Sequence, residues 1–267
     1  MCLAVFALDA HSRYRLVVAA NRDEFYARPA AAAHWWHAEN GTQLLGGRDL
    51  EAGGTWFGVN ARGRWAFVTN VREPGRHDPL APSRGRIVPA LLADSADAVT
   101  AMHHAVADAA TCNGFNAVAG DAGGIAFGSN RQPGVITVAG GVHGVSNATL
   151  DTPWPKLVQA RERLARFAAA GTEDAAPLWE LLADRTFAPD PLLPHTGVAP
   201  ELERMLSAAF IVSPRYGTRA STLLTVDLDG RVWLAERSFD AESCLAGEVE
   251  FRFRIPAHAA PPCNVRT

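Results

Sequence analysis

The sequence predicts a single α+β domain in which antiparallel sheets and helices occupy separate layers. Three observations support this. The chain of 267 residues is 48% hydrophobic, which is enough to bury one sizeable core. Its apolar runs are grouped as strands, helices, strands, helices and strands, rather than alternating one by one. No internal repeat or low-complexity linker divides residues 1–267. Two sheets stacked between two helical layers satisfy this order, although composition alone does not select that stack.

The chain is predicted to open with a hairpin of two largely buried strands. Residues 2–8 and 14–20 are apolar, β-leaning runs separated by the polar Asp9, His11, Ser12 and Arg13. The first residues would therefore be core, although chain termini usually fray.

A second hairpin is predicted after a less regular stretch. Residues 55–59 and 64–71 flank the turn Asn60–Gly63. In the preceding stretch, His34–His37 is expected to be a half-buried loop, because the adjacent tryptophans point to different sides. Arg48 and Asp49 are expected to close a pocket mouth or bind a polar group of a ligand or, equally, to form an ion pair on a loop.

The rest of the chain alternates between helical and strand groups. Helical spacing covers residues 84–93 and 96–110, with Ser95 and Asp97 as capping candidates, and later 156–170 and 175–183. Predicted strands, separated mostly by glycines, cover 114–119, 124–128, 135–139, 141–146, 219–227, 231–237 and 247–255. Residues 256–267 are expected to form a polar tail.

Charge and cysteine usage exclude several classes of function. The chain has 25 Lys+Arg against 28 Asp+Glu, so no basic stripe favours nucleic acid. The 4 cysteines show no CxxC spacing, which argues against a disulfide framework or a metal site. We expect no signal peptide and no membrane span, because no apolar run approaches about 18 residues. A reducing, cytoplasmic location fits these features.

Cys2 carries the sharpest chemical signal. Removal of Met1 would leave a thiol and a free α-amine on one Cα. Their reference pKa values are about 8.5 and 7.7–8.0, so the amine can accept the thiol proton near neutral pH. This combination predicts acyl transfer, whereas the alternative is an ordinary buried strand cysteine.

Four polar residues, Asn21-Arg22-Asp23-Glu24, follow the return strand of the first hairpin and would lie near Cys2. Asp23 is expected to orient the α-ammonium group, and Arg22 to favour the thiolate by its charge. The alternative is a strand-end turn with a surface ion pair.

These residues resemble the namesake motif of the NRDE family, also called transport-and-Golgi-organisation-2-like proteins. Further motifs support the resemblance over nearly the whole chain: Gly46–Asp49, Gly53–Asn60, Val68–Arg72, Gly144–Asn147 and Tyr216–Arg219. More distantly, the chain is similar to the choloylglycine hydrolase group of N-terminal cysteine amidases. That similarity implies a four-layer αββα N-terminal-nucleophile hydrolase fold.

The distant similarity also implies roles for particular residues. Asn70 would donate to the oxyanion, Asn147 would position the terminus, and Arg219 would support a thiolate or a substrate carboxylate. With Cys2 and Asp23 they form the predicted catalytic set. Residues predicted to bind substrate or support that set are Asn21, Arg22, Glu24, Arg48, Asp49 and Trp56. The amidases carry an Arg three residues before the Asp, where this chain has Ala20.

Two functions follow from the resemblance. The first is hydrolysis of a carbon–nitrogen amide bond in a partly apolar small molecule, with no required cofactor and no metal. The second is non-catalytic binding or trafficking of haem, lipid or acyl-CoA in the same pocket, where a cysteine thiolate is also a possible haem ligand.

Overall fold

The computed structural model describes residues 3–256 and contains two antiparallel sheets. Sheet A has six strands in the order β10-β1-β2-β11-β12-β13, and sheet B has seven in the order β3-β4-β5-β6-β7-β8-β9. The strands of sheet A are β1 (Leu3–Leu8), β2 (Tyr14–Phe25), β10 (Gly141–Val145), β11 (Tyr216–Asp227), β12 (Arg231–Phe239) and β13 (Leu245–Arg254). Those of sheet B are β3 (Ala30–His37), β4 (Gln43–Asp49), β5 (Phe57–Val59), β6 (Trp65–Asn70), β7 (Phe115–Asp121), β8 (Gly124–Ser129) and β9 (Val135–Val138).

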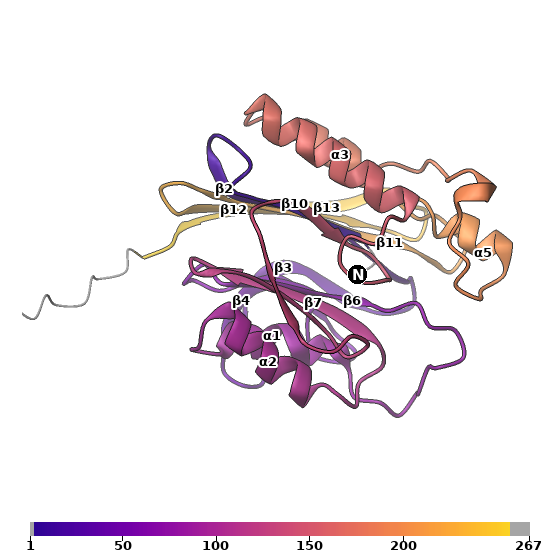
Figure 1. Cartoon of the computed structure of the whole chain (residues 1–267), viewed down its shortest axis with the longest axis horizontal. Helices are drawn as coiled ribbons and strands as arrows, with labels where there is room; N and C mark the ends of the chain where they lie inside the picture. The colour runs from indigo at the N-terminus through magenta and orange to yellow at the C-terminus, as the bar shows by residue number, and fades with distance from the viewer. Residues whose placement is uncertain (1–2, 257–267) are drawn as a thin grey trace, which may run out of the picture.

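The helices lie on the outer faces of the two sheets (Figure 1). Sheet B is covered by α1 (Ile87–Ala93) and α2 (Ala98–Asp108), and sheet A by α3 (Pro155–Ala170) and α4 (Ala176–Leu182). Short helical turns complete the chain: η1 (Arg84–Arg86), η2 (Asp190–Leu192) and α5 (Pro200–Met205). The predicted four-layer αββα arrangement is thereby confirmed.

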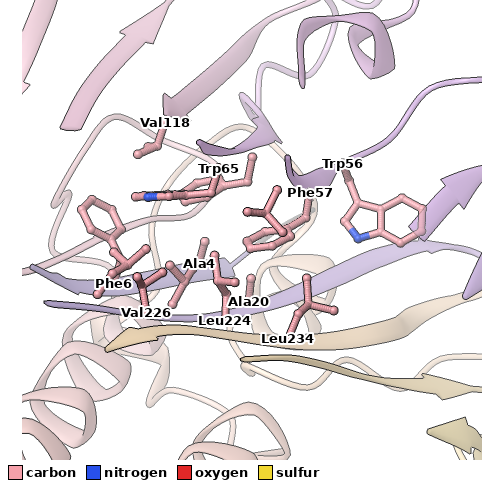
Figure 2. Close-up of a cluster of buried hydrophobic side chains, with 14 of the residues drawn as sticks. Ala4, Phe6, Ala20, Trp56, Phe57, Trp65, Val118, Leu224, Val226 and Leu234 are labelled. Carbon is pink, nitrogen blue, oxygen red and sulfur yellow. The ribbon is translucent and has the colours of Figure 1, made fainter. Parts of the chain in front are cut away.

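Strand alternation in the first hairpin explains why sheet A can be buried on both faces. Ala4 and Phe6 of β1 point into the core between the sheets, whereas Leu3 and Val5 pack under the helices. Trp56, Phe57 and Trp65 of the facing layer project toward these strands (Figure 2). The predicted buried hairpin is confirmed over its described residues.

Helix ends follow local chemistry. The Asp97 carboxylate accepts from the amides of Val99 and Thr100, which confirms it as the cap of α2. Helix α3 begins at Pro155 and ends at Ala170, and the next residue, Gly171, has a φ of 61°, the left-handed conformation that glycine adopts readily.

Two predictions for the first part of sheet B are wrong. The predicted loop His34–His37 belongs to β3, because residues 30–37 pair with β4 across a bulge between Ala31 and His34. Arg48 and Asp49 are the last residues of β4 and not part of a loop. Trp35 does face the core between the sheets, while Trp36 faces the helices, as adjacent strand residues must. Pairing with β4, the next strand in the chain, created this element without a strong local signal.

Two other boundaries also differ from the prediction. Strand β2 continues five residues beyond the predicted end at Ala20, because β11 pairs with it as far as Phe25. The short α5 was not predicted. The predicted tail lies outside the described residues from position 257 onward.

Candidate functional site

The polar motif at the end of β2 is divided between the two faces of sheet A. Alternation along the strand sends Asn21 and Asp23 toward the helical layer and the segment before β11. Arg22 and Glu24 face sheet B, where Trp56 and Asp49 lie. The four residues are consecutive in the sequence, but the structure places them in two different environments.

Asn21 binds the helical layer to sheet A. Its side-chain amide donates to the carbonyl oxygens of Leu182 and Ala209, each at 2.8 Å, and its oxygen accepts from the Ser221 hydroxyl at 2.6 Å. The side chain is completely buried. Because all three contacts are internal, Asn21 supports the site by joining sheet A to the helical layer.

Asp23 is held by the start of β11. Its Oδ1 accepts from the Thr218 hydroxyl at 2.6 Å, and that hydroxyl oxygen accepts from the amide of Ile211 at 2.9 Å. Both side chains are buried. This chain of hydrogen bonds fixes the carboxylate next to the strand that carries Arg219.

Arg22 is a buried cation between the sheets, with only 3% of its surface exposed. Its guanidinium carbon lies 4.3 Å from the centroid of the Trp56 ring, a cation–π arrangement. Nη2 is 3.9 Å from Oε2 of Glu24 and 3.9 Å from Oδ2 of Asp49. Burial lowers the pKa of Arg22, and the two carboxylates act in the opposite direction.

Those carboxylates are largely committed to other donors. Asp49 accepts from Nε of Arg28 at 2.8 Å and from the amides of Glu51 and Ala52. Burial acts to raise the pKa of Asp49, but these hydrogen bonds and the charge of Arg28 together hold it below its ordinary value. Glu24 accepts from the amide of Phe25. The carboxylates of Glu24 and Asp49 therefore compensate the charge of Arg22 from 3.9 Å, beyond hydrogen-bond distance.

Arg219 occupies a bulge in β11. The register shifts between Thr218 and Ala220, so Arg219 has no partner residue on β2. Its Nη1 donates to the carbonyl oxygens of Phe25, Tyr26 and Arg28, the closest at 2.9 Å. The predicted functional arginine therefore clamps the turn between β2 and β3.

Asn70 and Asn147 meet at the ends of β6 and β10. The Asn147 side-chain amide donates to the backbone oxygen of Asn70 at 2.9 Å. Alternation along β6 places position 70 on the face that carries Ala66 and Val68, which pack against the helices. The inward position beside it is Thr69, whose hydroxyl accepts from Asn116.

Arg48 is separated from the other predicted residues. Its guanidinium carbon lies 4.8 Å from the Trp36 ring centroid, on the helical face of sheet B. Asp49, one residue later, faces the core and Arg22. The structure thus groups Arg22, Glu24, Asp49 and Trp56 and leaves Arg48 outside the group.

Sequence reasoning missed Glu236, which lies on β12 between the sheets. Its oxygens accept from the amide of Ala33 at 2.7 Å and from the Thr222 hydroxyl at 2.9 Å. Burial raises the pKa of Glu236 to about 7, and these hydrogen bonds and the charge of Arg22 oppose that rise. A single Glu at an inward position of a strand was the available signal.

Cys2 lies outside the described residues. The next residue, Leu3, pairs with Asn21 in the register of β1 and β2. Cys2 is bonded to Leu3 through one peptide bond, and consecutive Cα atoms are about 3.8 Å apart. Arg22 follows Asn21 directly on β2.

No group of three or more His, Cys, Asp or Glu side chains within residues 3–256 is arranged to hold a metal ion. No helix in the same range is long and apolar enough to cross a membrane.

Comparison with known proteins gives consistent matches. A family model described as Transport and Golgi organisation 2 matches residues 1–241. The Transport and Golgi organization protein 2 homolog of Bos taurus is 36% identical over 260 residues, covering 89% of this chain and 93% of that protein. The Homo sapiens homolog is 34% identical over 262 residues, with the same coverage of 89% and 93%. Among solved structures, the Caenorhabditis elegans N-acylethanolamine-hydrolyzing acid amidase ortholog has a TM-score of 0.48 and 12% identity, over 84% of this chain and 92% of that one.

Proposed function

The chain belongs to the Transport and Golgi organisation 2 family, and we propose that it hydrolyses an amide bond of a partly apolar small molecule with Cys2 as nucleophile. The family prediction made from the motifs is confirmed. The activity is our proposal, and the observation that supports it best is Arg22. A buried cation with unused hydrogen-bonding capacity immediately follows the residue that pairs with Leu3.

The reaction we propose begins after removal of Met1. The free α-amine of Cys2 takes the thiol proton, and the thiolate attacks the amide carbon to form a tetrahedral oxyanion. Collapse of that intermediate breaks the C–N bond while the ammonium returns its proton to the leaving nitrogen. Water then attacks the thioester, releasing the carboxylic acid and restoring the thiol.

Arg22 and Asp23 have separate roles in this proposal. The guanidinium of Arg22 lowers the cost of forming a thiolate, because a nearby positive charge favours the deprotonated form. Asp23, held by Thr218, orients the ammonium group. Arg219 acts through its clamp on residues 25–28, which fixes the chain just beyond the motif.

Asn70, the last residue of β6, and Asn147, which follows β10, are the remaining residues of the proposed site. The hydrogen bond from Asn147 to the Asn70 backbone fixes the loop that follows β6. The distant resemblance, and not its place on the helical face of β6, is the reason to propose Asn70 as an oxyanion donor.

Hydrolysis by the purified protein tests the proposed function. A panel of N-acyl amides of increasing chain length should yield acid and amine with the wild type. Cys2→Ala should abolish turnover, and Asp23→Asn should lower it by about 10²-fold or more. Gly247→Ala, at an open position of β13, is the control and should retain full turnover. Turnover that survives Cys2→Ala rules out the mechanism; no turnover combined with tight haem or acyl-CoA binding would favour the non-catalytic alternative.

A further inference from the structure

Two buried hydrogen-bond donors between the sheets have no acceptor. They are Nη1 of Arg22 and Nε1 of Trp56, and neither has a hydrogen-bond partner within the part of the chain that the structure describes. Arg22 is 3% exposed and Trp56 is 6% exposed. Buried polar groups in native proteins are nearly always bonded, because an unbonded one costs free energy. Nη1 of Arg22 and Nε1 of Trp56 are two such exceptions whose side chains are in contact.

The two side chains come from β2 of sheet A and from the residue before β5 of sheet B, and they stack on each other. The Arg22 guanidinium carbon lies 4.3 Å from the Trp56 ring centroid. Figure 2 shows the indole nitrogen of Trp56 on the side of the ring that faces the strands of sheet A. Gly47 lets the ring lie flat against β4, because a Cβ there would be 2.2 Å from Cζ2 of Trp56. The position of the indole is therefore built into the sheet.

The nearest carboxylates do not occupy this space. Glu24 and Asp49 each approach Nη2 of Arg22, at 3.9 Å, and Nη1 has no hydrogen-bond partner among the described residues. Asp49 is already bonded to Arg28 and to two turn amides. These acids compensate part of the charge of Arg22 and leave one guanidinium nitrogen for another acceptor.

We propose that Arg22 Nη1 and Trp56 Nε1 together bind an acyl oxygen: the carbonyl oxygen of an amide substrate and the carboxylate oxygen of its acid product. One cationic and one neutral N–H suit an oxygen that carries partial or full negative charge. The inference rests on the proposed function and names the group of the substrate that this site recognises. Carboxylates bind more tightly than the matching neutral amides, because only they carry a full charge.

Indole NMR tests this binding without relying on turnover. Protein labelled with ¹⁵N-tryptophan is titrated with sodium hexanoate and, separately, with hexanamide, and Trp56→Phe assigns the signal. The Trp56 indole proton should move downfield and saturate, at lower concentrations of hexanoate than of hexanamide. The Trp36 indole, which already donates to Gly46 at 3.0 Å, is the internal control and should stay unchanged.

Matched variants identify the two donors. By calorimetry, Trp56→Phe and Arg22→Lys should each weaken hexanoate binding by about tenfold, the size expected for one hydrogen bond to a charged group. Trp36→Phe should leave the affinity unchanged. Equal affinity in Trp56→Phe and wild type, or an unmoved Trp56 signal, overturns the inference.

The two proposals fail in different ways. Hydrolysis without a Trp56 response would remove the acyl-oxygen site and leave the Cys2 mechanism standing. A Trp56 response without hydrolysis would retain carboxylate recognition and remove the mechanism.

Discussion

At the level of single residues, Glu236 is a buried carboxyl group that forms hydrogen bonds in the otherwise largely apolar core between the sheets. Its carboxyl group links β12 to the Ala33 amide of sheet B, where the bulge in β3 leaves that amide without a strand partner. Thr222 of the neighbouring strand supplies the second hydrogen bond. Burial raises the pKa of Glu236 from its ordinary 4.5 to about 7, so the folded protein favours the protonated form.

Glu236 should therefore make stability fall as pH rises. The folded state binds this proton more tightly than the unfolded chain, so the contribution is fully present below about pH 4.5 and is lost as pH rises through about 7. The loss is about 3 kcal/mol at most. Glu236→Gln should remove it, so that urea unfolding shows the variant more stable than wild type at pH 8 and similar at pH 4.5.

The exposed Glu248→Gln on β13 is the control for this experiment, and its difference from wild type should be small at both pH values. If Glu236→Gln follows the same pH dependence as the wild type, the protonation of Glu236 is not coupled to folding.

At the level of elements, β4 completes the site, and it is one of two strands that the sequence did not predict. Strand β4 supplies Asp49 to Arg22 and places Gly47 under Trp56. The motif's neighbourhood could be predicted, because the hairpin at residues 2–20 has clear apolar runs. Strand alternation also predicts that Arg22 and Asp23 lie on opposite faces, although the end of β2 at Phe25 was not predicted.

Gly47→Ala tests the contact between β4 and the tryptophan. The added Cβ would meet the Trp56 ring at 2.2 Å, so the ring must move. We expect a loss of about 1–3 kcal/mol in the free energy of unfolding, the usual cost of overpacking. Circular dichroism during urea titration measures it.

Gly247→Ala is the matched control, because no atom lies within 4 Å of its added Cβ, and its stability should stay within about 0.5 kcal/mol of wild type. A similar small effect for Gly47→Ala would show that the Trp56 ring is not held against β4.

At the level of the whole molecule, a buried ion pair joins elements from both sides of the sandwich. Nη1 of Arg72, which follows β6 of sheet B, lies 2.6 Å from Oε2 of Glu203 on α5. The Arg72 guanidinium carbon is also 4.7 Å from the Trp154 ring centroid, before α3. One residue thus connects sheet B, α5 and the segment that leads into the outer helix.

Breaking this pair one residue at a time should cost more than removing it whole. Arg72→Met leaves Glu203 buried without its cation and should lower the free energy of unfolding by about 3–5 kcal/mol. The double variant Arg72→Met/Glu203→Met should recover much of that loss. Denaturant unfolding of the four proteins in the cycle measures the coupling, and additive effects would show that the pair contributes nothing.

The sequence predicted which segments form strands and helices, but it did not predict several contacts between residues far apart in the chain. Grouped apolar runs predicted the strand and helix groups, and the motifs predicted the family, because both signals are local. The bulge at Arg219 and the position of Glu236 depend on contacts between segments far apart in the chain. Such contacts leave little trace in a single sequence.

The most direct test of the central claim is the intact mass of the purified protein before and after reaction with a thiol-directed acylating probe. We predict that Met1 is absent, that one adduct forms, and that peptide mapping places it on Cys2. Cys2→Ala should form no such adduct, and Arg22→Met should acquire it more slowly, because fewer thiols are ionised. A retained Met1, or a Cys2 that does not react while Cys112 or Cys244 does, would contradict the account.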